Sequence, residues 1–184
     1  MRRLIGTAFL ALFIVFAMTS KSSAIDLENT LYLQLKSGRV VIEMRPDIAP
    51  KHVKRIKELV RQKFYDGLKF HRVIPDFMAQ TGDPQGDGTG GSGVNIPAEF
   101  TNLEKFYRGS VGMARAQNPN SADSQFFITF APSQWLDGQY TIWGEVVDGM
   151  EFVDAIKKGS ESNNGQVTDP DIIITMRVAA DVKK

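Results

Sequence analysis

Residues Phe70–Gln80 read FHRVIPDFMAQ, a short stretch that places Arg72 inside an otherwise apolar strand. A second run, Ser124–Phe130, reads SQFFITF. Strand alternation puts Gln125 and Phe127 on one face of this run and a wholly apolar set on the other. The apolar face belongs to a core. The mixed face is typical of an apolar pocket with a few oriented polar groups.

Short apolar runs broken by turns continue on both sides of these segments. Alternating residues over Leu31–Leu35 and Val40–Met44 predict a β-hairpin. The apolar spacing from Ala49 to Val60 predicts an amphipathic helix, and Met150–Lys157 a second, shorter one. The other candidate strands are Lys69–Ile74, Phe77–Gln80, Ser110–Ala114, Gln125–Phe130, Thr141–Val147 and Ile172–Val178. About eight strands and two helices favour a closed antiparallel barrel or a sandwich over an alternating β-α-β fold.

The composition restricts the chemistry available. The chain has 184 residues, enough for one domain with a core. It has no Cys, which excludes disulfides, thiol nucleophiles and Cys-ligated zinc. With two His, at positions 52 and 71, a histidine-rich metal centre is also excluded. We therefore expect neither a metal nor a cofactor.

The first 24 residues have the order of a secretory signal. Arg2 and Arg3 precede the uncharged, mostly apolar run Leu4–Met18, and small residues lead to Ala24. We predict a signal peptide over residues 1–24 and a mature domain over residues 25–184, exported across the inner membrane to the periplasm. The alternative is an uncleaved anchor, although 15 apolar residues are fewer than the ~20 that a membrane span needs. Paired arginines also occur in twin-arginine signals, but the flanking pattern does not match.

Cleavage after Ala24 would leave a nearly neutral protein. The mature chain keeps 19 basic residues against 21 acidic ones. We expect it to have no general attraction for nucleic acid and no stable membrane association.

A glycine-rich stretch, Gly82–Gly93, matches the dinucleotide-binding pattern G-x-G-x-x-G within Gly88–Gly93. That pattern requires a helix to follow, but Val94–Pro97 is not helical. Asp83 and Asp87 would also repel phosphate, and their spacing does not fit a calcium loop. We interpret the stretch as a surface loop that borders a groove.

Several ordered blocks resemble the signature of the cyclophilin-type peptidyl-prolyl cis-trans isomerases. The resemblance extends over about residues 29–178. The blocks are Phe70–Gln80, Gly88–Gly91, Gly112–Arg115, Ser124–Thr129, Trp135–Gly138 and Gly144–Val146. The resemblance implies a mainly β fold, a closed eight-stranded antiparallel barrel capped by two α-helices. The short form with an export signal is similar to bacterial periplasmic members.

The resemblance also implies roles for single residues. Arg72 matches the catalytic arginine, and His71 a histidine at the edge of the groove. Arg115 stands where many members carry Asn, and Tyr140 where His is common, both beside the substrate. The proline ring would be held by Phe77, Met78, Phe127 and Leu136, with Gln80, Ala114, Gln125 and Trp135 at further positions of the groove.

The implied reaction needs only non-covalent chemistry. Rotation about an X-Pro amide has a barrier of ~18–20 kcal/mol because the C–N bond is partly double. A guanidinium can hydrogen-bond to the prolyl nitrogen of the twisted amide, and we expect Gln80 to orient it. The expected partners are proline-containing segments of unfolded or exported proteins, cyclosporin is a candidate ligand, and we expect a monomer. The alternative is a proline-segment-binding module or holdase chaperone with little catalysis.

Overall fold

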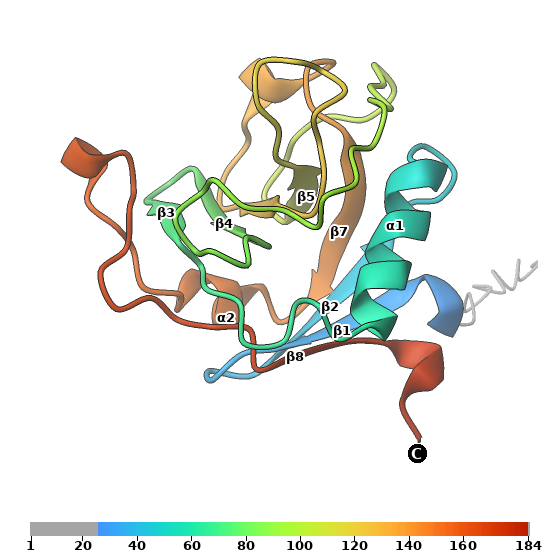
Figure 1. Ribbon diagram of the computed structural model, residues 1–184, viewed down its shortest axis with the longest axis horizontal. Coiled ribbons are helices and arrows are strands. Elements are labelled where there is room, and N and C mark those ends of the chain that lie inside the picture. The colour runs from blue at the N-terminus through green and yellow to red at the C-terminus, as the bar shows by residue number, and fades with distance from the viewer. Residues whose placement is uncertain (1–25, 184) are drawn as a thin grey trace, which may run out of the picture.

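A computed structural model describes residues 26–183, in which eight strands form a single antiparallel sheet (Figure 1). The strand order is β3-β4-β6-β5-β7-β2-β1-β8. The predicted hairpin is confirmed, with Leu31 paired to Ile42. The strands are β1 (Thr30–Gln34), β2 (Arg39–Met44), β3 (Arg72–Ile74), β4 (Met78–Thr81), β5 (Ser110–Met113), β6 (Phe126–Thr129), β7 (Ile142–Asp148) and β8 (Thr175–Val178). The predicted signal peptide lies outside the described residues.

The sheet is an open half-barrel, so the expectation of a closed barrel is wrong. Strands β3 and β8 end the sheet and do not pair with each other. Instead of a ladder, isolated bridges pair Lys69 with Ile172 and Arg72 with Gln166, and single backbone hydrogen bonds join the loops beside them. Both strands are shorter than predicted, since β3 begins at Arg72 and β8 at Thr175. The residues before them bond to each other as irregular segments, with the Gly67 N–H donating to Ile173 O at 2.7 Å and the Phe70 N–H to Asp171 O at 2.9 Å.

Two α-helices pack against this sheet, as expected. Helix α1 (Pro50–Arg61) lies against β8, and α2 (Met150–Asp154) lies against β2. Helix α2 ends earlier than predicted because the Lys157 N–H donates to Asp171 Oδ2 at 2.8 Å instead of to a helix carbonyl. Among the described residues, no helix has the length and apolar character needed to cross a membrane.

The apolar interior has two parts. The larger part lies between the sheet and the helices and includes Phe126, Ile128 and Trp143. A smaller cluster lies on the other face of β4, β5 and β6. It consists of Met78, Phe106, Phe127, Leu136 and Ile142. This second cluster supports the floor of the candidate site, because Met78 and Phe127 also line a pocket.

Candidate functional site

A pocket of about 310 Å³ opens on the face of the sheet that carries the smaller cluster. All ten residues that line it are among the site residues predicted from the sequence. They are Arg72, Phe77, Met78, Gln80, Ala114, Arg115, Phe127, Trp135, Leu136 and Tyr140. The fold therefore brings together side chains from β3, β4 and β6, from the turn between β3 and β4, and from the segments after β5 and before β7. We call this space the proline pocket.

A bend after β3 turns Phe77 into the proline pocket. Asp76 has a positive φ of 56°, and the Phe77 N–H donates to Ile74 O at 3.2 Å. The Phe77 ring then packs against Trp135, with centroids 5.4 Å apart. Phe127 and Leu136 are buried, whereas Trp135 is 60% exposed. The pocket thus has an apolar floor and an aromatic rim that remains open to solvent.

Arg72 reaches the pocket from β3 and is fixed by neutral partners. Its Nη1 donates to Gln80 Oε1 at 3.1 Å, as expected for the orienting role of Gln80. Its Nε donates to Asn164 O and its Nη2 to Asn164 Oδ1, both at 3.0 Å. Among residues 26–183 no carboxylate forms an ion pair with it. Burial lowers the pKa of Arg72, but an arginine is still protonated at neutral pH.

The sequence reasoning missed Asn164. It lies 92 residues from Arg72, in the loop between α2 and β8. Its φ of 51° is left-handed, a conformation that Asn adopts more readily than most residues. The available signal was the Asn164-Gly165 pair, which is typical of a turn. That signal locates a turn but does not say which distant strand the turn contacts.

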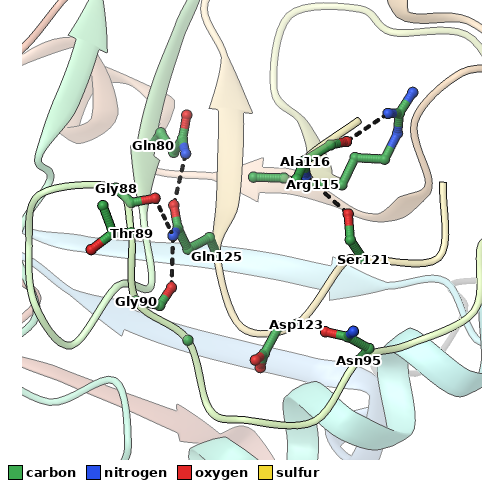
Figure 2. Close-up of a pocket in the computed structure, with 12 residues that line it drawn as sticks. Gln80, Gly88, Thr89, Gly90, Asn95, Arg115, Ala116, Ser121, Asp123 and Gln125 are labelled. Carbon is green, nitrogen blue, oxygen red and sulfur yellow. Dashed lines mark hydrogen bonds between the residues drawn. The ribbon is translucent and has the colours of Figure 1, made fainter. Parts of the chain in front are cut away.

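Amide side chains connect Arg72 to the glycine-rich loop. Gln80 Nε2 donates to Gln125 Oε1 at 2.9 Å (Figure 2). Gln125 Nε2 then donates to Gly88 O at 3.1 Å and to Gly90 O at 2.8 Å. Each glutamine is thereby held in one orientation, with its oxygen accepting and its nitrogen donating. The orientation of the guanidinium thus depends on a chain of hydrogen bonds that ends at backbone carbonyls.

The glycine-rich loop borders a second pocket of about 320 Å³, which we call the adjoining pocket. It shares Gln80, Ala114 and Arg115 with the proline pocket. Asp83, which is buried, organises the loop by accepting N–H groups from Gln85, Asp87 and Gly88. The other lining residues are Gly88, Thr89, Gly90, Gly91, Asn95, Ala116, Ser121, Asp123 and Gln125. The expected loop beside a groove is therefore present.

His71 lines neither pocket. Its side chain is buried, and neither ring nitrogen has a hydrogen-bond partner among the described residues. Burial lowers its pKa, partly offset by the nearby Asp83 carboxylate. The ring is therefore neutral at physiological pH. Within residues 26–183, no group of three or more His, Cys, Asp or Glu residues could hold a metal ion.

Comparison with known proteins places this arrangement in a family. The model of the cyclophilin type peptidyl-prolyl cis-trans isomerase/CLD family matches residues 30–178. The chain belongs to the cyclophilin-type peptidyl-prolyl cis-trans isomerases. A "Probable peptidyl-prolyl cis-trans isomerase" of Brucella suis is 55% identical over 98% of this chain and 96% of its own length. "Peptidyl-prolyl cis-trans isomerase-like 1" of Homo sapiens is 43% identical over 74% of this chain and 82% of its own.

Solved cyclophilin structures share the fold. A cyclophilin from Hirschia baltica superimposes with a TM-score of 0.77 at 26% identity, covering 86% of this chain and 77% of its own. A cyclophilin-type isomerase from Cryptosporidium parvum, solved in the presence of the dipeptide Ala-Pro, gives a TM-score of 0.74 at 29% identity. That match covers 81% of this chain and 98% of the other.

Proposed function

We propose that this cyclophilin accelerates rotation about X-Pro amide bonds in exported proteins, with Arg72 as its catalytic residue. The observation that carries the proposal is a fixed guanidinium beside an apolar pocket. Arg72 has five N–H groups and uses three of them on Gln80 and Asn164. The remaining two, one on each Nη, have no partner among residues 26–183 and can donate to a bound amide.

The reaction needs a group that favours the twisted amide. Twisting ends conjugation and returns a lone pair to the prolyl nitrogen, which can then accept a hydrogen bond from Arg72. Uncatalysed rotation takes ~10–100 s. A turnover near ~10³ s⁻¹ requires a gain of about 10⁴–10⁵-fold, or about 5–7 kcal/mol. One fixed donor aimed at the developing lone pair contributes ~3–4 kcal/mol of this gain.

The apolar walls hold the proline ring in place while the preceding residue rotates. Phe77, Met78, Phe127 and Leu136 form this grip, and Trp135 and Tyr140 close its rim. The residues that precede proline would extend over Gln80 and Ala114 toward the adjoining pocket, since both residues border the two spaces. Cyclosporin is proposed to bind over the same surface.

A protease-coupled assay on an Ala-Pro peptide tests the catalytic role. We expect Arg72→Ala to lose at least about a hundredfold in kcat/KM, the usual cost of removing one fixed donor. The control is Arg177→Ala, because Arg177 lies on β8 and bonds Asp66 and its neighbouring carbonyl. Equal rates for wild type and Arg72→Ala would reject the role. A wild-type protein that binds the peptide without catalysis would favour the holdase alternative.

The cellular setting is proposed from the sequence of residues 1–24. An apolar segment behind two arginines would direct export, and cleavage after Ala24 would release a periplasmic protein. N-terminal sequencing of the protein recovered from the periplasm is expected to begin at Ile25. Recovery in the membrane fraction with an intact Met1 would contradict cleavage.

A further inference from the structure

Arg115 lies at the border of the proline pocket and the adjoining pocket, and its side chain donates hydrogen bonds to backbone carbonyls of the protein. Its Nε and Nη2 donate to Gln139 O at 3.1 and 3.0 Å. Its Nη1 donates to Ala116 O at 2.8 Å and to Gln117 O at 3.2 Å. Four of its five N–H groups are therefore used on backbone carbonyls. The guanidinium joins the loop after β5 to the loop before β7.

The same guanidinium also lies over two aromatic rings. Its Cζ is 4.6 Å from the centroid of the Tyr140 ring and 5.8 Å from that of Phe100. The Tyr140 ring in turn meets Phe127 edge-on, with centroids 5.9 Å apart. Tyr140 and Phe127 both line the proline pocket. A continuous contact thus runs from Arg115 through Tyr140 to the pocket floor.

We propose that Arg115 is a positioning residue that holds Tyr140 as the outer wall of the proline pocket. The proposal rests on the proposed function, because it assumes that this pocket receives the proline ring. The side chain does not need to contact the substrate. It fixes the Gln139 carbonyl next to Tyr140 and covers one face of the tyrosine ring, so that the wall is formed before the peptide arrives.

The geometry of these contacts requires a guanidinium. A lysine ammonium is a compact charge and cannot reach three carbonyls in two loops while covering a ring face. Loss of the wall would weaken the grip on proline in the ground state and the transition state alike, because Arg72 and its partners are unchanged. Such a loss raises KM and leaves kcat nearly constant. A general loss of folded protein would lower the apparent kcat and leave KM unchanged.

The experiment measures KM and kcat separately for Arg115→Ala, Arg115→Lys and Tyr140→Ala, with Arg177→Ala as the matched control. We expect Arg115→Ala to raise KM about fivefold, the scale of a cation–π contact in a partly buried site, with kcat within about twofold. Arg115→Lys should not restore KM. The double variant Arg115→Ala/Tyr140→Ala should bind no more weakly than Tyr140→Ala, because both changes remove the same wall. The control should keep the wild-type KM.

A second readout does not depend on activity. In wild type the Arg115 Nε–H should exchange slowly with solvent in ¹⁵N spectra, because it is bonded to Gln139 O. In Arg115→Lys, which retains the charge, the Tyr140 and Phe127 ring resonances should shift. An unchanged KM in folded Arg115→Ala, or KM effects of the two single changes that multiply, would overturn the proposal. A wild-type protein without isomerase activity would instead overturn the proposed function and leave the ring-resonance test intact.

Discussion

The position of one guanidinium depends on residues from three separate parts of the chain. Arg72 and Gln80 are cross-strand partners in β3 and β4. Asn164 approaches from the loop after α2 and accepts two hydrogen bonds, one through its backbone oxygen and one through its side chain. These two contributions can be separated by mutation, because glycine adopts the left-handed backbone of Asn164 without strain.

Asn164→Gly should keep the backbone acceptor and remove only the side-chain one. We expect kcat to fall about threefold to tenfold, with KM little changed, because the donor to the twisted amide is less well fixed. Asp169→Gly is the matched control, since Asp169 is exposed and also left-handed, with φ of 54°. Steady-state kinetics on the same peptide decide the matter. An unchanged kcat in Asn164→Gly would mean that Gln80 and the Asn164 carbonyl suffice.

The catalytic chemistry uses no group that titrates near neutral pH. Arg72 remains charged, and burial keeps the neutral form of His71 by lowering its pKa. The rate should therefore vary by less than about twofold between about pH 6 and pH 8. A pH–rate profile of the wild type checks this. A steep fall on acidification that follows a pKa at or below the ordinary histidine value of ~6.5 would contradict a mechanism without a titrating group.

At the scale of elements, helix α1 is stabilised from outside its own sequence. Its N-cap, Ala49, provides no side-chain acceptor. Glu99 accepts the N–H groups of Lys51 and His52 and also bonds His52 Nδ1 at 2.7 Å. The Glu99 N–H donates to Thr141 Oγ1, next to Tyr140. The cap of the helix is thus connected to the segment that forms the rim of the proline pocket.

This buried pair predicts how stability depends on pH. Desolvation lowers the pKa of His52, so the unfolded chain binds a proton more readily than the folded one. Burial would raise the pKa of Glu99, but hydrogen bonds from His52 and two backbone N–H groups outweigh it and lower the pKa. Because both pKa values are lower in the folded chain than in the unfolded chain, the folded state is favoured most at a pH above the pKa values that His52 and Glu99 have in the unfolded chain. Stability should fall below about pH 6.5 through His52 and further below about pH 4.3 through Glu99.

Urea unfolding at several pH values measures this decline. His52→Gln should reduce the loss of unfolding free energy between about pH 7.5 and pH 5.5. The loss that remains in this variant would come from buried His71. Glu99→Gln should cost about 1–2 kcal/mol at neutral pH, the scale of a lost helix cap. Glu58→Gln, an exposed change on the same helix, is the control. Stability that increases on acidification would contradict this account.

The elements differ in how well the sequence predicts them. Helix α1 and the first hairpin were predicted within one or two residues because their apolar periods are strong and local. The lining of the proline pocket was predicted through the family resemblance, not through spacing alone. Asn164, the Glu99 cap and the early end of α2 could not be predicted. Each of them depends on a side chain that meets the backbone of a distant segment, and periodicity carries no information about such contacts.

At the scale of the whole molecule, the open sheet has little free edge. Beside β3, the Val73 N–H donates to Gly165 O and the Val73 carbonyl accepts from Gly159. Beside β8, Asp66 accepts the Met176 N–H and pairs with Arg177 at 2.7 Å. Loops and a charged pair thus occupy the positions where a second chain would add a strand. The alternation of the sequence indicated eight strands. It did not indicate that loop residues would bond the outer edge of β3 in place of β8, which leaves the barrel open.

The covered edges predict a monomer. Sedimentation equilibrium of the mature protein should give one species with the mass of a single chain over a wide concentration range. Removing the charge that protects one edge, by Arg177→Ala, should leave the monomer intact, because the loops remain. A concentration-dependent dimer in the wild type would contradict this reading of the edges.

The most direct test of the account separates binding from rotation at Arg72. NMR exchange spectroscopy of an Ala-Pro peptide with excess ligand gives the rate of cis-trans exchange on the protein, and a titration of the same samples gives the affinity. For Arg72→Ala we predict an affinity within about threefold of wild type and an exchange rate lower by about a hundredfold or more. A variant that loses affinity but still exchanges the bound peptide at the wild-type rate would show that Arg72 holds the ligand and does not stabilise its twisted amide.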